Sequence, residues 1–208
     1  MLLADTYLDR VDFLKYLPQT DCAACRVSTC REFIEGLKRG EKKPADCPDI
    51  SESIYYPFHN TLNADNILPK FPCVTVPQPG PIGVVEINGP VHGSPLLISG
   101  NNIHTQDVLT SMLATTRSPF FLVFTDTKGD TVDMAVIYKT LTAEQIKKDA
   151  QNPRGLNMTS HQKVVIPGLA ATICNELEIL TGCKVTVGPI CAAELPLFFA
   201  ESWLTPAA

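Results

Sequence analysis

From position 81 onward, short continuous apolar runs alternate with amphipathic stretches. Continuous apolar runs are typical of buried strands, and apolar residues at helical spacing are typical of helices. Strands are expected at Ile82–Ile87, Pro95–Ser99, Phe120–Thr125, Val132–Tyr138, Lys163–Pro167 and 184–188, and helices at 104–116, 141–150, 169–182 and 193–203. Strands that alternate with helices indicate an α/β sandwich with a largely parallel sheet. Ligands of such folds lie at the C-terminal ends of the strands.

Four of the eight cysteines lie close together near the amino terminus. Cys22, Cys25, Cys30 and Cys47 are separated by two, four and sixteen residues. A threonine and a glutamate on either side of Cys30 have the spacing of a capping box, so a helix is expected to begin there and to end near Gly40. The N–H groups of its first turn have no partner within the helix, and they are expected to point toward a group bound by the thiolates.

Four thiolates in this arrangement suit either a [4Fe–4S] cluster or tetrahedral zinc. The cluster is favoured because zinc ribbons usually carry two CxxC pairs, and this chain has a single pair among these residues. A disulfide framework is disfavoured because the thiols crowd one end of a chain that has no secretion signal. The remaining cysteines are expected to be small buried hydrophobic residues, namely Cys73, Cys174, Cys183 and Cys191.

The segment between the clustered cysteines and the first strand has a different composition. Residues 49–80 are rich in proline, asparagine and serine and have no helical period, which predicts an ordered or semi-extended connector. Three parts are therefore expected: a small cluster domain with one helix at 1–50, a connector at 51–80, and an α/β domain at 81–208.

Charge and composition exclude several classes of function. The chain has 17 lysines and arginines against 22 aspartates and glutamates, and its basic residues are scattered, so no nucleic-acid partner is expected. No apolar stretch approaches the roughly 20 residues of a membrane span, and charges stand where a signal peptide would be apolar. No membrane partner is therefore expected. We expect a cytoplasmic location. The common motifs of serine hydrolases, zinc proteases and nucleotide-binding enzymes are missing.

Several motifs occur in the order that is typical of one family. They are the cysteine spacing, DTKGD at 126–130, TSHQKVVIPGLA at 159–170, LTGCKVTVGP at 180–189 and AELPLFF at 193–199. Together they resemble the large (gamma) subunit of the corrinoid iron–sulfur protein of the acetyl-CoA decarbonylase/synthase pathway. The resemblance implies an amino-terminal [4Fe–4S] domain and a carboxy-terminal, Rossmann-like corrinoid-binding domain. The TIM barrel between these domains in the family has no counterpart here, because the connector has only about 30 residues.

The resemblance also implies roles for individual residues. Cys22, Cys25, Cys30 and Cys47 match the cluster ligands. The residues that match corrinoid-contacting segments, and would contact corrin amides or the nucleotide tail, are Asn101, Asn102, Thr105, Asp126, Thr127, Lys128, Gly129, Ser160, His161, Lys163 and Gly168. The chain departs from the family at residues 133–139, which are bulky where the family has a Trp–Cys pair and glycines. Bulky side chains would clash with a corrin bound in the usual way.

Two functions agree with these features. In the first, the chain is a carrier rather than an enzyme by itself: it holds a cobalamin-type cobamide for methyl transfer, and its cluster supplies the electron that reactivates oxidised cobalt. A separate methyltransferase or TIM-barrel partner protein and a redox partner would work with it. In the second, the chain is a corrinoid-free electron-transfer or interaction module, with residues 136–139 filling the former corrin surface. A zinc-stabilised binding module is a third alternative.

Overall fold

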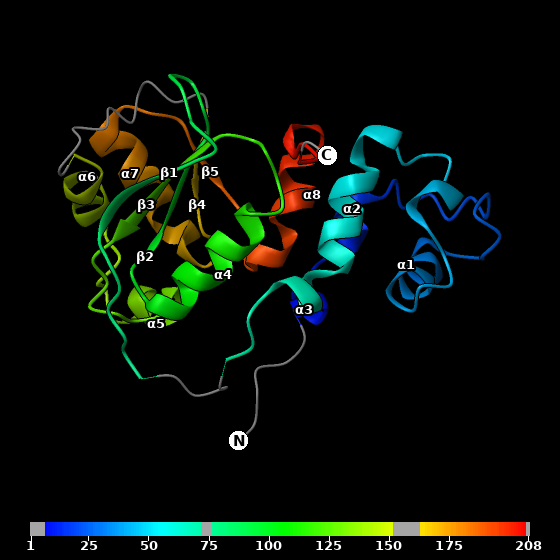
Figure 1. The fold of residues 1–208 in the computed structure, drawn as a ribbon, viewed down its shortest axis with the longest axis horizontal. Helices are drawn as coiled ribbons and strands as arrows, with labels where there is room; N and C mark the ends of the chain where they lie inside the picture. Colours follow the sequence, from blue (N-terminus) through cyan, green and yellow to red (C-terminus); the bar gives the residue numbers. More distant parts are fainter. Residues whose placement is uncertain (1–6, 72–75, 152–162, 207–208) are drawn as a thin grey trace.

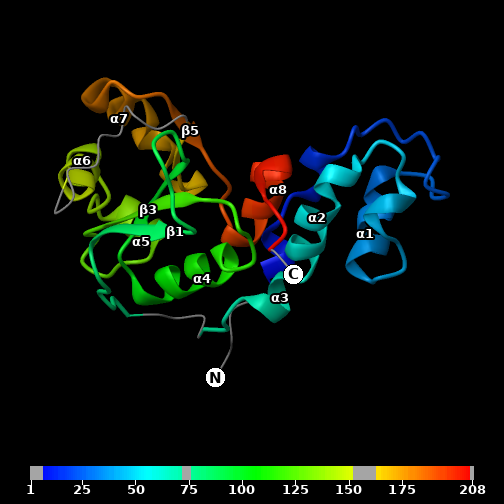
Figure 2. The ribbon, with the colours of Figure 1, turned by 45° about the horizontal axis from the view of Figure 1, so that its top comes forward.

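A computed structural model describes residues 7–71, 76–151 and 163–206 of the chain. An amino-terminal lobe around α1 (Cys30–Lys38) and α2 (Tyr55–Leu62) lies beside an α/β unit (Figure 1). Helix α8 (Leu195–Phe199) lies between α2 and the sheet in Figure 1 and also in Figure 2. Within the described residues, no helix has the length and apolar character that a membrane span requires.

The α/β unit is built on a five-stranded sheet in the order β1-β3-β2-β4-β5. Its strands are β1 (Gly83–Ile87), β2 (Leu96–Gly100), β3 (Phe120–Thr125), β4 (Val164–Ile166) and β5 (Val185–Val187). β1 pairs with β3 in an antiparallel manner, whereas the pairs β2–β3, β2–β4 and β4–β5 are parallel. The α/β class and the largely parallel sheet predicted from the sequence are therefore confirmed. The carboxyl ends of β2 to β5 meet at one edge of the sheet.

Helices cover both faces of this sheet. The helices of the unit, besides α8, are α4 (Ile103–Leu113), α5 (Val132–Ile137), α6 (Ala143–Gln151) and α7 (Cys174–Thr181). Side chains alternate along a strand, so Leu97 packs into one core with α4 and α8, while Leu96 and Ile98 pack into a second core with α5, α6 and α7. The first core continues into the amino-terminal lobe, where it includes Phe33 and Phe58.

The prediction of a strand at Val132–Tyr138 is wrong, because most of these residues form helix α5. Val132, Ala135 and Val136 are spaced at i, i+3 and i+4, so they share one helical face, and this face packs into the second core. A short continuous apolar run does not distinguish a buried strand from a buried helix. Lys139 then reverses the chain with a positive φ of 57°.

The segment expected as an ordered or semi-extended connector, which has no helical period in its sequence, contains helices. These are α2 and α3 (Ala64–Ile67), preceded by a 3-10 turn at Glu52–Ile54. Phe58 and Ala64 are fully buried, and α2 packs against α8. Pro57 is compatible with α2 because it lies in the first turn, where a backbone N–H has no partner within the helix. The division into domains at 1–50, 51–80 and 81–208 stays a prediction.

The amino-terminal lobe contains the predicted helix after the CxxC pair. The Glu32 N–H donates to Thr29 Oγ1 (3.1 Å), and the Ser28 N–H donates to Glu32 Oε2 (2.8 Å). These two bonds confirm that a threonine and a glutamate cap the start of α1. Gly40 follows the helix with a φ of 73°, which confirms the predicted stop. Besides the turn at Glu52–Ile54, the lobe contains the 3-10 turns η1 (Tyr7–Arg10), η2 (Phe13–Tyr16) and η3 (Pro44–Asp46) before α2.

Candidate metal centre and ligand cavity

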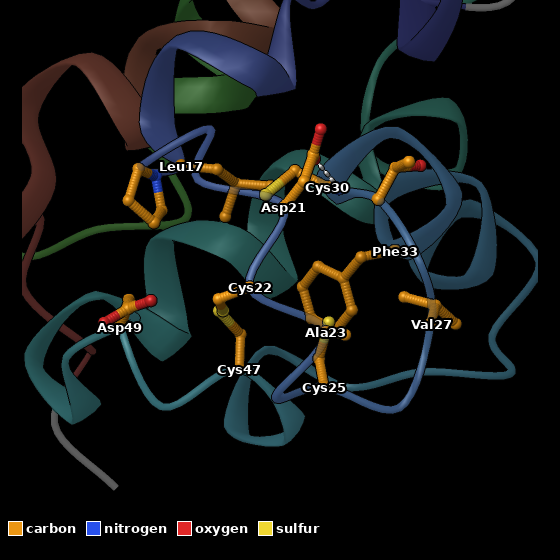
Figure 3. Close-up of a pocket in the computed structure, with 12 residues that line it drawn as sticks. Leu17, Asp21, Cys22, Ala23, Cys25, Val27, Cys30, Phe33, Cys47 and Asp49 are labelled. Atoms are coloured by element: carbon orange, nitrogen blue, oxygen red, sulfur yellow. Dashed lines mark hydrogen bonds between the residues drawn. The ribbon is translucent and has the colours of Figure 1, made fainter.

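Four cysteines from three segments line one pocket in the amino-terminal lobe (Figure 3). Cys22 and Cys25 lie on the loop before α1, Cys30 begins that helix, and Cys47 follows η3. Cys25, Cys30 and Cys47 are buried, whereas Cys22 is exposed. The remaining lining is mostly apolar and consists of Leu17, Pro18, Asp21, Ala23, Val27, Thr29, Phe33 and Asp49. The fold thus brings together the four cysteines that the sequence groups by spacing.

The loop that carries Cys22 and Cys25 is sharply curled. Asp21, Ala23 and Arg26 have positive φ angles of 47°, 57° and 59°. This conformation costs a residue other than glycine about 1–2 kcal/mol, so contacts from outside the loop have to maintain it. Asp21 Oδ1 accepts a 2.7 Å hydrogen bond from the Cys30 N–H, and Lys42 Nζ donates a 2.9 Å hydrogen bond to the Cys25 carbonyl.

The sequence predicts that the N–H groups in the first turn of α1 point toward a group bound by the thiolates, and the structure differs. The Cys30 N–H donates to the Asp21 carboxylate, and the Glu32 N–H donates to the Thr29 hydroxyl. These two N–H groups therefore do not point toward a bound group, and the expectation is wrong for them. The physical reason is capping: side chains that precede a helix compete for the same donors as a ligand does.

The protonation state of the thiols depends on their burial. Burial raises the pKa of the Cys47 thiol, hydrogen bonds from the backbone of Asp49 and Ile50 lower it, and the neighbouring Cys25 raises it further; the net shift is upward. A thiol has to lose its proton before it binds a metal, so metal binding at this site releases protons and strengthens as the pH rises.

The donor set fits an iron–sulfur cluster. Over residues 7–71, 76–151 and 163–206, no three His, Cys, Asp or Glu side chains form a group that could hold a single metal ion. A [4Fe–4S] cluster sets a different requirement, because each of its four thiolates binds a separate iron at its own corner. Four thiols that surround one pocket, with an apolar lining, meet that requirement in donor type and number.

Asn101 and Asn102 follow β2 at the carboxyl edge of the sheet, but their side chains are used inside the fold. Asn101 Oδ1 accepts hydrogen bonds from the N–H groups of Thr127 (3.0 Å) and Gly129 (3.1 Å). Asn102 Oδ1 caps α4 by accepting a hydrogen bond from the His104 N–H (3.0 Å). Each asparagine is 1% exposed. They hold the turn after β3 and the start of α4 in place.

The turn at residues 126–129 lies at the same edge of the sheet. Thr127 is fully buried, and the Gly129 carbonyl accepts a 2.7 Å hydrogen bond from Asn102 Nδ2. Lys128 Nζ lies 2.8 Å from Asp126 Oδ2, and this hydrogen bond lowers the pKa of the Asp126 carboxyl. Asp126 and Lys128 are the members of this turn whose side chains reach the surface.

The last group of predicted contacts is divided between the two ends of β4. Lys163 precedes the strand, and its Nζ lies 4.1 Å and 4.7 Å from the ring centroids of Phe198 and Phe199. Burial lowers the pKa of Lys163. Gly168 follows the strand and packs against the backbone after β5, where a Cβ at position 168 would lie 2.8 Å from the Gly188 carbonyl oxygen. Ser160 and His161 lie outside the described residues.

A cavity of about 380 Å³ lies at the carboxyl ends of β2 and β4. Ser99 and Ile166 line it from the strands, and Thr105 lines it from the first turn of α4. Tyr7 and Arg10 contribute to its wall from the amino-terminal lobe. Thr105 is the one predicted corrinoid contact, among those that the structure describes, that lines this cavity.

The sequence indicates the edge of the sheet at which this cavity lies, but not the residues around it. Tyr7 and Arg10 are far from the strands in sequence, and no motif connects them with the sheet. Thr131, Val132 and Asp133 line the cavity, whereas residues 136–139 do not. Ile137 and Tyr138 are 66% and 60% exposed instead. Residues 136–139 therefore do not fill the cavity.

Two family models match the chain. Residues 17–48 match a family described as "Putative Fe-S cluster", and residues 67–199 match the family "CO dehydrogenase/acetyl-CoA synthase delta subunit". Residues 49–66 separate the two matches, so no segment of barrel size lies between them. The resemblance to a shortened form of this family's proteins is thereby confirmed.

Curated relatives carry the name acetyl-CoA decarbonylase/synthase complex subunit gamma. Subunit gamma 2 of Methanosarcina thermophila is 33% identical over 121 residues, which are 57% of this chain and 26% of the relative. The subunit of Methanopyrus kandleri is 30% identical over 128 residues, which are 62% of this chain and 28% of the relative. That of Archaeoglobus fulgidus is 29% identical over 121 residues, or 58% of this chain and 26% of the relative. The match thus spans about a quarter of the length of each relative.

The two matched segments divide the candidate sites between them. The segment 17–48 includes all four clustered cysteines, and the segment 67–199 includes the whole sheet and most of the cavity wall. The second match covers 133 of the 208 residues. The chain therefore belongs to the CO dehydrogenase/acetyl-CoA synthase delta subunit family.

Proposed function

We propose that the chain is a carrier protein that holds a [4Fe–4S] cluster on Cys22, Cys25, Cys30 and Cys47 and a corrinoid at the carboxyl edge of its sheet. The observation that carries the proposal is the single pocket lined by all four cysteines. A bound cluster supplies single low-potential electrons, and a bound corrinoid supplies a cobalt that carries a methyl group. The residues of the chain bind both groups, orient them and control their access to water.

The lining of the cysteine pocket suits a cluster of low potential. Leu17, Val27 and Phe33 cover the pocket with apolar surface. Apolar surroundings exclude water and disfavour the additional negative charge of the reduced state, so they lower the reduction potential. Cys22 is exposed while the other three thiols are buried. A redox partner would therefore approach the cluster at the Cys22 edge.

The cavity at the sheet edge is the candidate site for the corrinoid. Its volume of about 380 Å³ falls within the range of sites that enclose small ligands. A corrinoid is larger than such ligands, so the cavity would enclose one part of it and the ring would lie against the mouth. Val108, Leu109 and Leu195 offer apolar surface to that part, and Arg10 and Thr105 offer hydrogen-bond donors.

A corrinoid held in this way would leave one face of its ring uncovered. A partner protein, either a TIM-barrel protein or a methyltransferase, would cover that face and exchange the methyl group. The names of the relatives support an assembly with other proteins, since each is called a subunit of a complex.

A second function is favoured by a specific observation. The polar groups of Asn101, Asn102 and Thr127 are buried and bonded within the fold, so they are not free for a corrinoid. This arrangement favours a corrinoid-free electron-transfer or interaction module that retains the cluster. The two functions differ in corrinoid uptake, and they agree on the cluster.

Anaerobic reconstitution with iron and sulfide, followed by metal analysis and a UV–visible spectrum, tests the cluster. The expected content is about four irons per chain. Cys30→Ala should lose the cluster, whereas Cys174→Ala should keep it, because Cys174 begins α7 and does not line the pocket. Equal iron content in the two variants would refute the ligand assignment. Zinc in place of iron would favour a structural metal site.

Corrinoid uptake is tested by adding cobinamide or cobalamin to the reconstituted chain. Ile190 lines the cavity and is 65% exposed, so Ile190→Trp inserts a large ring at the mouth and should weaken uptake at least about tenfold. Ile179→Trp makes the same change on α7, where the side chain is 86% exposed and outside the cavity wall, and uptake should not change. Equal uptake by the two variants would contradict the cavity as the site. A wild-type chain that binds iron but no corrinoid would establish the second function.

A further inference from the structure

Lys42 reaches from the segment after α1 to the cysteine loop. Its Nζ donates a 2.9 Å hydrogen bond to the Cys25 carbonyl. Its backbone N–H donates a 3.1 Å hydrogen bond to the Gly36 carbonyl, so the residue is held at both ends. The side chain therefore forms a bridge between α1 and the second cysteine of the CxxC pair.

Gly36 makes room for this bridge. A Cβ at position 36 would lie 2.7 Å from Lys42 Cγ, which is closer than two non-bonded carbon atoms approach. Glycine in a helix costs about 1 kcal/mol relative to alanine. Helix α1 therefore has a less favourable residue at the point where the Lys42 side chain crosses it.

The charges around the pocket give the bridge an electrostatic role as well. Asp21 and Asp49 are acidic residues of the lining, and the Asp21 carboxylate is bonded to the Cys30 N–H. Four thiolates would add more negative charge. The Lys42 ammonium contributes positive charge to this region, and it lies against Cys25, one of the proposed ligands.

We infer that Lys42 is a positioning residue for the cluster. Lys42 holds the Cys25 end of the strained loop, and its positive charge raises the reduction potential of the cluster. The inference rests on the proposed cluster. Ala23 lies within the CxxC residues and Arg26 directly follows them, and both have positive φ angles, so the loop relaxes when the contact to Cys25 is lost. A nearby positive charge stabilises the more negative, reduced state of a cluster, and this stabilisation raises its potential.

Three variants separate these effects. Lys42→Met removes the charge and the hydrogen bond and keeps most of the apolar stem. Lys43→Met makes the same change of net charge at the next residue, whose side chain is exposed and does not line the pocket. Gly36→Ala keeps the charge but displaces the Lys42 stem.

The first measurement uses the reconstituted full chain. Lys42→Met should shift the midpoint potential downward and should release iron to a chelator several-fold faster than the wild type. Gly36→Ala should release iron faster with a smaller shift in potential, and Lys43→Met should match the wild type in both. Wild-type values for Lys42→Met, or equal shifts for Lys42→Met and Lys43→Met, would overturn the inference.

The second measurement uses the metal-free chain and does not depend on the cluster. Labelling of Cys25 by a thiol reagent, followed by mass spectrometry, reports how well the loop is held. Labelling should be several-fold faster in Lys42→Met and Gly36→Ala than in the wild type or Lys43→Met. A wild-type chain that takes up no iron would refute the proposed cluster, whereas unchanged labelling in a chain that does take up iron would refute the role of Lys42.

Discussion

Asn101 satisfies several hydrogen-bonding groups at once in the turn after β3. Its Oδ1 accepts hydrogen bonds from the Thr127 N–H (3.0 Å), the Thr127 hydroxyl (3.0 Å) and the Gly129 N–H (3.1 Å). Its Nδ2 donates to the Gly80 carbonyl (3.1 Å). A single buried amide therefore joins the end of β2, the turn at 126–130 and the segment that leads into β1.

Asn101→Ala should destabilise the fold markedly, because it leaves two buried N–H groups without an acceptor. Each buried group that loses its partner costs about 1–3 kcal/mol, so we expect a loss of about 3 kcal/mol in the free energy of unfolding. Denaturant unfolding measures this loss. Asn66→Ala is the matched control, since Asn66 is exposed and bonded to the neighbouring Asn63 side chain, and its cost should stay below about 0.5 kcal/mol. Equal costs would refute the bracing role of Asn101.

Residues differ in how much of their role can be predicted from the sequence. The pocket that brings Cys22, Cys25, Cys30 and Cys47 together was predictable, because thiols at CxxC spacing have few other uses in such numbers. The role of Asn101 was not, because asparagines also form turns and caps. The side chain makes the same kinds of hydrogen bond in a ligand site and in a turn, and packing decides between them.

Among the turns of the fold, those at Gly40 and Gly129 have similar backbone angles and different surroundings. Gly40 has a φ of 73°, and among the described residues no atom beyond its chain neighbours lies within 4 Å of a built Cβ, whereas Gly129 has a φ of 80° and its Cβ would lie 2.3 Å from the Pro79 nitrogen. Gly129 therefore has to satisfy a close approach as well as a backbone angle.

The two turns should respond differently to alanine. Gly40→Ala should cost about 1–2 kcal/mol of stability, which is the strain of the left-handed conformation alone. Gly129→Ala should cost clearly more, because the chain around Pro79 has to move as well. Denaturant unfolding of both variants gives the comparison. Equal losses would mean that the contact with Pro79 does not constrain the turn.

At the scale of helices and strands, predictions from the sequence succeeded where the apolar pattern extended over enough residues or where a capping residue was present. The helix α1 was predictable from its cap and apolar stripe, and β3 from its continuous run of six residues. Helix α5 has six residues, which is too short to establish a helical period. Helix α2 contains Pro57 and polar residues, and it packs against α8, which is distant in sequence.

At the scale of the whole molecule, the amino-terminal lobe and the α/β unit share one continuous core. A buried carboxylate adds to this contact: Glu194 is 2% exposed and accepts a 2.7 Å hydrogen bond from the Tyr16 hydroxyl. Burial, and then the Glu194 carboxylate, raise the pKa of Tyr16, so the hydroxyl keeps its proton and remains a donor. Lys15 forms an ion pair with the same carboxylate. Tyr16 and Lys15 directly precede Leu17 of the cysteine pocket, so the two parts are connected close to the proposed cluster.

If the two parts unfold as one unit, a change in either part should shift both together. Phe58→Ala removes a fully buried ring from α2, and Ile146→Ala removes a fully buried side chain from α6 in the second core. Substitutions of this kind cost about 2–5 kcal/mol. Fluorescence of Trp203, the only tryptophan, reports the α8 side, and labelling of the buried Cys25 and Cys30 reports the lobe. In urea, the midpoints of the two probes should coincide and should move together in both metal-free variants. In Ile146→Ala, the urea midpoint of Trp203 fluorescence could move while the midpoint of cysteine labelling stays unchanged. This result would support separate domains on either side of residues 51–80.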